Sequence, residues 1–170
     1  MCDRLRDEIQ ALARDRAWQS ALDRVLEHFA ADSGTIHLLG PDGALHLTAA
    51  SRGMPQFVLD TVKVVPVGKG MAGLSVERRE PVSACNIQTD ASGDVRPGAK
   101  ATGLQGSIVV PIFRAEAAVG ALGIANRGER TFTEAETRLL VRVGRAMGDS
   151  LPAFHSGGPC PPVRSPPAKP

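Results

Sequence analysis

The sequence contains no long apolar segment. No run approaches the roughly twenty apolar residues that a helix needs to cross a bilayer. The first residues, Met1 to Arg4, begin a charged helical stretch and contain no apolar signal core. We therefore expect a cytoplasmic protein that does not enter a membrane.

Cysteine is scarce as well. Cys2 and Cys160 lie in the terminal segments, Cys85 is the one cysteine in the body of the chain, and no C-x-x-C pair occurs. An odd and scattered set of cysteines is typical of a reducing compartment and does not suit a disulfide scaffold. We interpret Cys85 as a buried, inert thiol.

Aromatic residues and net charge are both low. Aromatic residues make up 4% of the chain and tyrosine is absent, which argues against a site that stacks a purine base. Twenty basic and eighteen acidic residues give a net charge of +2. A balance of this kind provides no general field for nucleic acid or for acidic membranes, so any partner must be recognised locally.

One stretch, residues 68–73, fits the G-x-G-x-x-G spacing of a dinucleotide-binding turn. The alternating residues 61–67 predict a strand that runs into it. Only residues 74–79 follow before Glu80 and Pro81, and proline ends a helix, so there is room for about two helical turns. The acidic residue expected some twenty positions later would lie in a polar loop. We therefore interpret the glycines as a tight turn that starts a short helix.

The 170 residues are enough for one domain with a proper core, and 42% of them are hydrophobic. Apolar periodicity and turn signals predict an α+β order of elements. The expected elements are a helix over 3–31 with a break near 14–17, a hairpin of strands 35–39 and 44–50, a helical turn over 55–60, strand 61–67, a short helix, strand 81–86, a polar lid over 87–103, a second hairpin of strands 107–113 and 119–126, and a helix over 133–151 that starts with a capping box at Thr133 and Glu136.

This order of elements resembles the GAF domain family of small sensor modules. The resemblance rests on "VPVGKGMAGLSVERREPV", "GSIVVPIF" and "VGALGIANRGERTFTEAETRLL", and covers about residues 15–151. It implies an antiparallel sheet of about six strands, with the terminal helices on one face and the short helix and lid on the other. We expect residues 1–14 to be a helical extension and the proline-rich residues 152–170 to be disordered.

A second stretch resembles the signature of cyclic-nucleotide-binding GAF domains. It consists of Asn126, Arg127, Phe132 and Glu136, with Arg127 in place of lysine and Thr137 in place of a second acidic residue. Within the family the signature is thought to be structural. The resemblance therefore implies that these residues brace a loop against the final helix, and it does not imply a cyclic nucleotide.

The resemblance also implies a ligand cavity between the short helix and the lid. Arg96 and Lys100 could donate hydrogen bonds to an anion, and Arg96 is the better bidentate partner. The alternative is a lid whose polar residues only keep it soluble. The candidate ligand-binding residues are Gly70, Met71, Ala72, Cys85, Asn86, Gln88, Asp90, Arg96, Lys100, Thr102 and Ser107.

Other chemistry finds little support. His37 and His46 lie opposite each other if the first hairpin closes at 40–43, but no further ligand completes a metal site, so we expect an exposed strand face. Free methionine sulfoxide reductases are single GAF domains of this length, but they need a thiolate in the cavity with resolving cysteines nearby. Here residues 86–106 contain no cysteine. We expect no enzyme, no cofactor and no metal.

The sequence is therefore interpreted as a sensory GAF domain that binds a small molecule under its lid and signals through a separate partner protein. The basic lid favours a small anion such as nitrate or a carboxylate, because one class of stand-alone bacterial GAF proteins is a nitrate receptor. The main alternative is a ligand-free interaction module whose cavity is filled by its own side chains. Such a module would form a homodimer through the apolar faces of its terminal helices, which carry Trp18, Leu22, Val25, Leu139, Leu140 and Val143.

Overall fold

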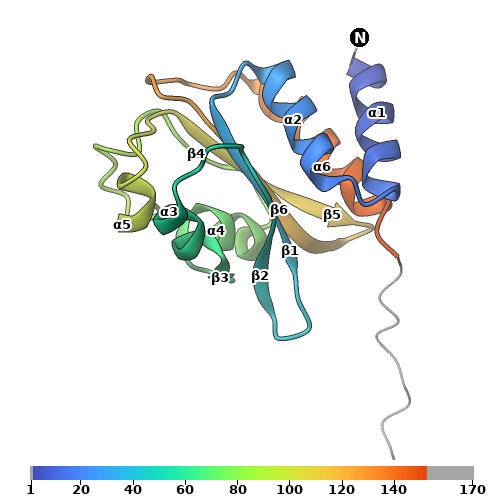
Figure 1. Cartoon of the computed structure of the whole chain (residues 1–170), viewed down its shortest axis with the longest axis horizontal. Coiled ribbons are helices and arrows are strands. Elements are labelled where there is room, and N and C mark those ends of the chain that lie inside the picture. Colours follow the sequence, from blue (N-terminus) through green and yellow to red (C-terminus); the bar gives the residue numbers. More distant parts are fainter. Residues whose placement is uncertain (1, 153–170) are drawn as a thin grey trace, which may run out of the picture.

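The computed structural model describes residues 2–152 and is built on one six-stranded antiparallel sheet (Figure 1). The strands lie in the order β3-β2-β1-β6-β5-β4. Their bounds are β1 Ser33–Leu39, β2 Ala44–Ala50, β3 Val64–Pro66, β4 Val82–Ala84, β5 Ser107–Arg114 and β6 Ala117–Ala125. The hairpins β1-β2 and β5-β6 join through β1 and β6, so the two strands at the centre of the sheet come from opposite ends of the chain.

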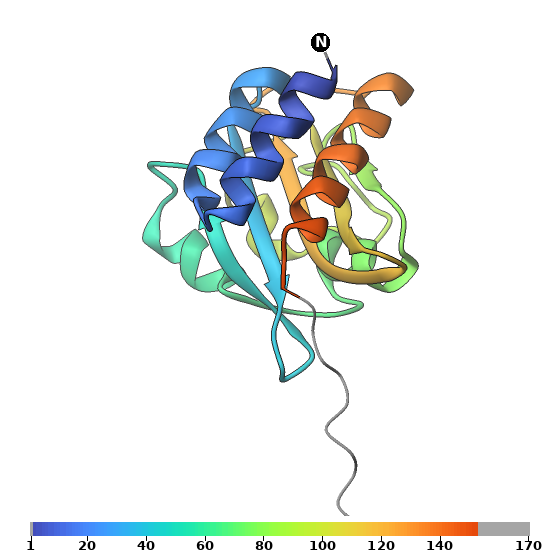
Figure 2. The same cartoon turned by 90° about the vertical axis from the view of Figure 1, so that its right-hand side faces the viewer.

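Helices α1 (Cys2–Arg14), α2 (Trp18–Phe29) and α6 (Glu134–Asp149) lie side by side on one face of the sheet (Figure 2). Their apolar stripes pack against the large side chains of β1, β5 and β6. The core that results includes Ile9, Leu22, Val25, Ile36, Leu122, Leu140 and Val143. The fold class and the layer arrangement expected from the sequence are thereby confirmed.

The expected break in the first helix lies at residues 15–17. Arg16 adopts a positive φ of 57°, which ends α1. Glu8 and Arg24 are six residues before Arg14 and six after Trp18, and their side chains form an ion pair of 2.7 Å. The two segments therefore form a helical hairpin. Helix α1 buries Leu5 and Ile9 against the rest of the core, although the sequence suggested only an extension.

The apolar helix faces that an interaction module would use to form a dimer pack instead against the core of their own chain. Leu22 and Val25 are fully buried, as are Leu140 and Val143. Trp18 and Leu139 are partly buried and pack against the same core. An apolar face that is already covered by its own chain offers little surface for a second copy, so this route to a dimer loses its physical basis.

The other face of the sheet carries α3 (Gln56–Val62), α4 (Gly70–Arg78) and the lid, which contains α5 (Pro97–Lys100). Gly68 and Gly70 have φ values of 84° and 62°, conformations that favour glycine. The chain thus turns sharply after β3 and enters a helix of nine residues. The interpretation of the glycine motif as a turn that starts a short helix is confirmed.

Strand β6 points its large side chains to one face of the sheet and its small ones to the other. Leu122 and Ile124 belong to the helix-side core. The alternate positions Ala121, Gly123 and Ala125 therefore face α4 and the lid, because successive side chains of a strand point to opposite faces. Small residues at the centre of the sheet leave space on this second face.

Most of the expected element boundaries agree with the structure to within a few residues. The capping box of α6 is present, since Glu136 N–H donates to Thr133 Oγ1 and Thr133 N–H donates to Glu136 Oε2. The expected disordered tail lies outside the described residues, apart from Pro152. None of the helices in residues 2–152 is long and apolar enough to cross a bilayer.

Candidate functional site

A cavity of about 150 Å³ lies between the second face of the sheet, α4 and the lid. Thr35, His37, Ser107 and Val109 of strands β1 and β5 line it from the sheet. The start of α4 contributes Gly70, Met71 and Ala72, and the lid contributes Arg96 and Ala99. The site thus draws on parts of the chain that lie far apart in the sequence.

Gly123 of β6 lies in the sheet between two residues that line the cavity. Gly123 pairs with Thr35 on one side and with Val109 on the other. A Cβ atom at Gly123 would lie 3.5 Å from Thr35 Oγ1 and 3.3 Å from Val109 Cγ2. The glycine therefore leaves free the space between two residues that line the cavity.

His37 is the most deeply buried polar residue that lines the cavity, with 2% of its surface exposed. Its Nε2 lies 2.8 Å from the carbonyl oxygen of Val62 at the end of α3. A carbonyl oxygen only accepts hydrogen bonds, so Nε2 carries a proton and donates it. Burial lowers the pKa of His37 and outweighs the opposing effect of the Val62 bond. The ring is therefore neutral, and Nδ1 is an acceptor.

That acceptor has no partner. His37 Nδ1 is the one buried side-chain nitrogen or oxygen in residues 2–152 without a hydrogen bond. A buried polar atom that is left unpaired costs about 1–3 kcal/mol, and such atoms in native proteins call for an explanation. Here the atom belongs to a residue that lines a cavity, which is where a bound molecule would supply the missing donor.

Arg96 is the one charged residue among those that line the cavity, and no carboxylate lines it in the described chain. The aliphatic part of Arg96 crosses the start of α4, because its Cδ lies 2.7 Å from the point that a Cβ of Gly70 would occupy. Glycine at position 70 therefore serves both the turn and the placement of Arg96.

Of the eleven candidate residues expected from the sequence, the structure brings together five. Gly70, Met71, Ala72, Arg96 and Ser107 line the cavity. The Ser107 hydroxyl also donates to the carbonyl oxygen of Ile124 at 3.3 Å, which leaves its lone pairs able to accept. The predicted residues that line the cavity thus come from the glycine turn, the lid and the sheet.

The other candidates in and beside the lid do not line the cavity, and they bond to the lid or to the loops next to it. Gln88 Nε2 donates to Leu104 O, and Lys100 Nζ donates to Asp90 O. Asn86 Nδ2 donates to Glu129 Oε1. The Thr102 hydroxyl donates to Ala99 O at 2.6 Å and lies near a different surface hollow. These side chains hold the lid in shape, a role that the sequence did not distinguish from ligand binding.

Two expectations from the sequence are wrong. Cys85 is exposed and does not line the cavity, because β4 ends at Ala84 and the thiol lies beyond the sheet. His37 is buried and does not lie opposite His46, since the strand register pairs His37 with Leu47 and Leu38 with His46. His46 therefore lies on the same face as its partner Leu38, and His37, the neighbour of Leu38 in the strand, lies on the opposite face. His46 instead contacts Asp42 at the hairpin tip.

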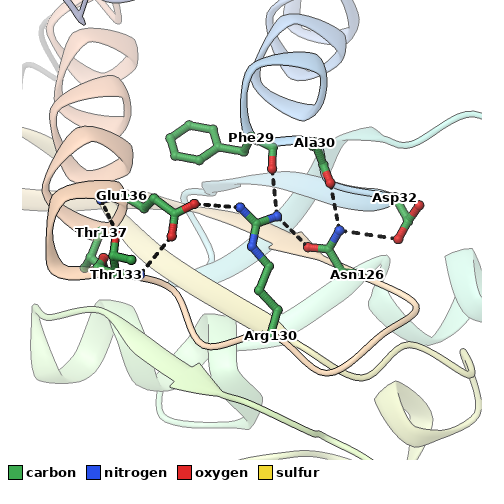
Figure 3. Close-up of polar contacts among 8 residues, drawn as sticks. All are labelled: Phe29, Ala30, Asp32, Asn126, Arg130, Thr133, Glu136 and Thr137. Atoms are coloured by element: carbon green, nitrogen blue, oxygen red, sulfur yellow. Dashed lines mark hydrogen bonds and ion pairs between the residues drawn. The ribbon is translucent and has the colours of Figure 1, made fainter.

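The loop signature forms a hydrogen-bonded network, as the family resemblance implied (Figure 3). Arg130, and not Arg127, supplies the cation. Its guanidinium donates to Phe29 O at 2.7 Å, to Asn126 Oδ1 at 2.9 Å and to Glu136 Oε1 at 2.7 Å. The Thr133 N–H and the Arg130 guanidinium hold the pKa of the Glu136 carboxyl below its usual range. The network joins the end of α2, the loop after β6 and the start of α6.

The burial of His37 predicts a pH dependence of stability. Its pKa is lower in the folded than in the unfolded chain, so below about pH 6.5 the unfolded chain binds a proton that the folded chain does not. The free energy of unfolding should therefore fall by up to about 1.4 kcal/mol per pH unit as the pH drops from 6.5 toward the folded pKa.

Urea unfolding at pH 7.5 and 5.5 checks this expectation. The loss of stability at pH 5.5 should be smaller in His37→Gln than in the native chain. His28→Gln, which changes an exposed side chain on α2, should behave like the native chain. Equal losses in all three proteins would show that His37 takes up a proton as readily in the folded as in the unfolded state.

The sheet, the flanking helices and the lidded cavity define a small α+β module of the kind found in signalling proteins. The GAF domain family matches residues 11–151, so the chain belongs to this family. No curated protein sequence gives a significant match.

Solved structures agree on the fold. The GAF domain of an Acinetobacter phosphoenolpyruvate-protein phosphotransferase superimposes with a TM-score of 0.71 at 21% identity, over 88% of this chain and 89% of that one. Free methionine-R-sulfoxide reductase of Neisseria meningitidis gives 0.69 at 17%, over 88% and 87%. A domain of a putative two-component sensor histidine kinase from Sinorhizobium meliloti gives 0.65 at 18%, over 80% and 88%. At these identities the likeness shows the shared fold.

Proposed function

We propose that this chain is a non-enzymatic regulatory domain that binds a small molecule between its sheet, α4 and the lid. The observation that carries the proposal is the unpaired Nδ1 of buried His37 in the lining of a cavity. A module that only mediates protein contacts would gain stability by filling this space and by pairing or replacing the histidine. The sensor kinase and phosphotransferase among the structural neighbours contain the same fold.

The size of the cavity restricts the ligand. A cavity of about 150 Å³ in a protein interior holds a molecule of roughly the size of benzene. A cyclic nucleotide is considerably larger, and apart from the His37 ring no aromatic side chain lines the cavity for a base to stack on. A ligand of about six non-hydrogen atoms fits without displacement of the lid.

The lid offers a route from binding to signalling. Arg96 and Ala99 belong to it and line the cavity. The same lid is tied to α4 by the ion pair of Arg78 with Asp94, at 2.9 Å. A ligand that contacts Arg96 would favour one arrangement of lid and α4 over others, and a partner protein that recognises this surface would sense the ligand.

The activity of the reductase among the structural neighbours requires chemistry that this cavity lacks. A thiolate must reach the substrate, and the exposed Cys85 is outside the cavity. Cys85→Ser separates the two functions. The variant should bind small molecules as well as the native chain does, whereas loss of a measurable sulfoxide reduction would favour the enzyme.

A screen of small molecules by thermal shift tests the proposed function. The panel should hold small carboxylates, inorganic anions, amino acids and cyclic nucleotides. A ligand present at one hundred times its Kd stabilises the folded chain by about 2.7 kcal/mol. The melting temperature should then rise by roughly 5–10 °C.

Gly123→Ala supplies the control for the site. The added methyl group would lie between Thr35 and Val109, where its contacts of 3.3–3.5 Å require only small shifts. We expect this variant to fold with near-native stability and to bind the hit at least about tenfold more weakly, because the methyl group occupies the floor of the cavity. Gly128→Ala, whose Cβ meets nothing within 4 Å, should bind normally. A hit that binds Gly123→Ala as tightly as the native chain would place the ligand elsewhere.

A further inference from the structure

Two parts of the cavity lining have different chemical requirements. In one part, the neutral ring of His37 donates from Nε2 to Val62 O, so its unpaired Nδ1 carries no proton. An unprotonated ring nitrogen only accepts, so a ligand must bring an O–H or N–H group to satisfy it. A simple anion such as nitrate has no donor and leaves this atom unpaired.

The other part of the lining, at Arg96 and the start of α4, favours negative charge. Arg96 lines it, and its guanidinium makes no hydrogen bond or ion pair with any residue in the range 2–152. The helix α4 begins beside it at Gly70, and the first N–H groups of a helix have no partner within the helix. The N–H groups of Met71 and Ala72, which also line the cavity, take part in none of the hydrogen bonds found between the described residues. An arginine next to free helix N–H groups suits a carboxylate.

The donor that His37 Nδ1 requires is better supplied by a neutral group than by a cation. No aspartate or glutamate lines the cavity to balance an ammonium group, and Arg96 would repel one. A hydroxyl group meets the need of Nδ1 without adding positive charge, and the hydroxyls of Thr35 and Ser107 line the same floor.

From these two parts of the lining we infer that the ligand is a small 2-hydroxycarboxylate, with its hydroxyl donating to His37 Nδ1 and its carboxylate held by Arg96 and the first N–H groups of α4. The inference rests on the proposed function and specifies the ligand class. It makes His37 the residue that selects for a donor and Arg96 the residue that selects for an acid. A molecule of this class with three or four carbons matches a cavity of about 150 Å³.

A pair of probes isolates the hydroxyl group. Lactate and isobutyrate have the same number of non-hydrogen atoms and the same carboxylate, and differ by a hydroxyl group in place of a methyl group. Titration of the full chain, followed by chemical-shift changes in its amide spectrum, should give a Kd for lactate about tenfold lower than for isobutyrate, because only lactate pairs the buried nitrogen. Equal affinities, or a preference for isobutyrate, would overturn the inference.

Two variants assign the roles. In His37→Gln the side-chain amide can still donate to Val62 O, but no acceptor remains at the position of Nδ1, so the preference for lactate should disappear. Arg96→Gln should raise the Kd values of lactate and isobutyrate by the same factor, so that the ratio of the two Kd values stays the same. If the ratio survives in His37→Gln, the hydroxyl group is recognised elsewhere and the inference is wrong.

A signal from the ring itself guards against a variant that does not fold. In the native chain the ¹⁵N resonance of His37 Nδ1 should move to lower frequency when lactate binds, as expected for a nitrogen that begins to accept a hydrogen bond, and should stay in place with isobutyrate. No shift at saturating lactate contradicts the assignment. If neither probe binds while another molecule from the thermal-shift panel does and is lost in Gly123→Ala, this inference fails and the proposed function stands.

Discussion

Arg130→Met is expected to lower the free energy of unfolding by about 2–3 kcal/mol. The guanidinium makes three hydrogen bonds, to Phe29 O, Asn126 Oδ1 and Glu136 Oε1, and lies over the Phe132 ring with its carbon 4.4 Å from the ring centre. The Arg130 side chain is only 22% exposed. When the arginine is lost, water can therefore replace only part of the hydrogen bonding to its three acceptor oxygens. Methionine keeps the apolar stem and removes the donors.

The measurement is urea unfolding of the two proteins, with a melting curve as a second readout, where a fall of roughly 5–10 °C is expected. Arg127→Met is the matched control. It removes the same charge from the same loop, but the Arg127 side chain is exposed and only its backbone N–H is bound, to Asp32 Oδ2. A control as unstable as Arg130→Met would show that loss of positive charge, and not the network, explains the effect.

The network also affects the base of the lid. The Arg130 N–H donates to Cys85 O, and the Gln105 N–H donates to Asn126 O. The loop that Arg130 fixes is thus bonded to residues just before and just after the lid. In Arg130→Met we therefore expect faster amide exchange at Gln105 and Gly106 than in the native chain. This connection gives the signature a structural reason that involves no cyclic nucleotide.

The elements of the fold could be predicted because their signals are local. The apolar runs of β5 and β6, the capping box at Thr133 and the glycine turn at 68–70 depend on neighbouring residues in the sequence. The break at Arg16 could be predicted because two apolar stripes are out of phase. Such features follow from local turn chemistry, apolar composition and the 3.6-residue period of the helices, which tertiary contacts did not override here.

The errors concern residues whose role depends on the second face of the sheet. His37 alternates with Ile36 and Leu38, a pattern that predicts one polar, exposed face. Because α3 and α4 cover that face, the histidine is buried instead. The signal that could have identified it was the family resemblance itself, which places a lid over this face, so a polar residue on a central strand there should line the cavity. Cys85 was misplaced for the opposite reason, since the short strand β4 ends one residue before it.

Gly73→Ala should destabilise the folded chain, although the position of Gly73 inside a helix suggests that alanine would stabilise it. A glycine inside an exposed helix costs about 1 kcal/mol relative to alanine, so the exchange normally stabilises. Here a Cβ at position 73 would lie 2.2 Å from the carbonyl oxygen of Pro66 and 3.1 Å from the backbone nitrogen of Gly68. These are backbone atoms of the turn that cannot rotate away as a side chain does, and Gly73 O accepts the N–H of Gly68 at 2.9 Å. Helix α4 packs directly on the turn only because residue 73 has no side chain.

We therefore expect Gly73→Ala to lower the free energy of unfolding by about 3 kcal/mol, in the upper range for overpacked sites. Since Met71 and Ala72 precede it in α4 and line the cavity, the helix start should shift away from Arg96, and lactate binding should weaken even in molecules that stay folded. Urea unfolding and the lactate titration, with Gly128→Ala as the control that adds a methyl group in open space, measure both effects. A Gly73→Ala chain as stable as the native one would mean that α4 can move off the turn at little cost. The cavity would then be bounded by a mobile helix, whereas the ligand inference depends on a fixed one.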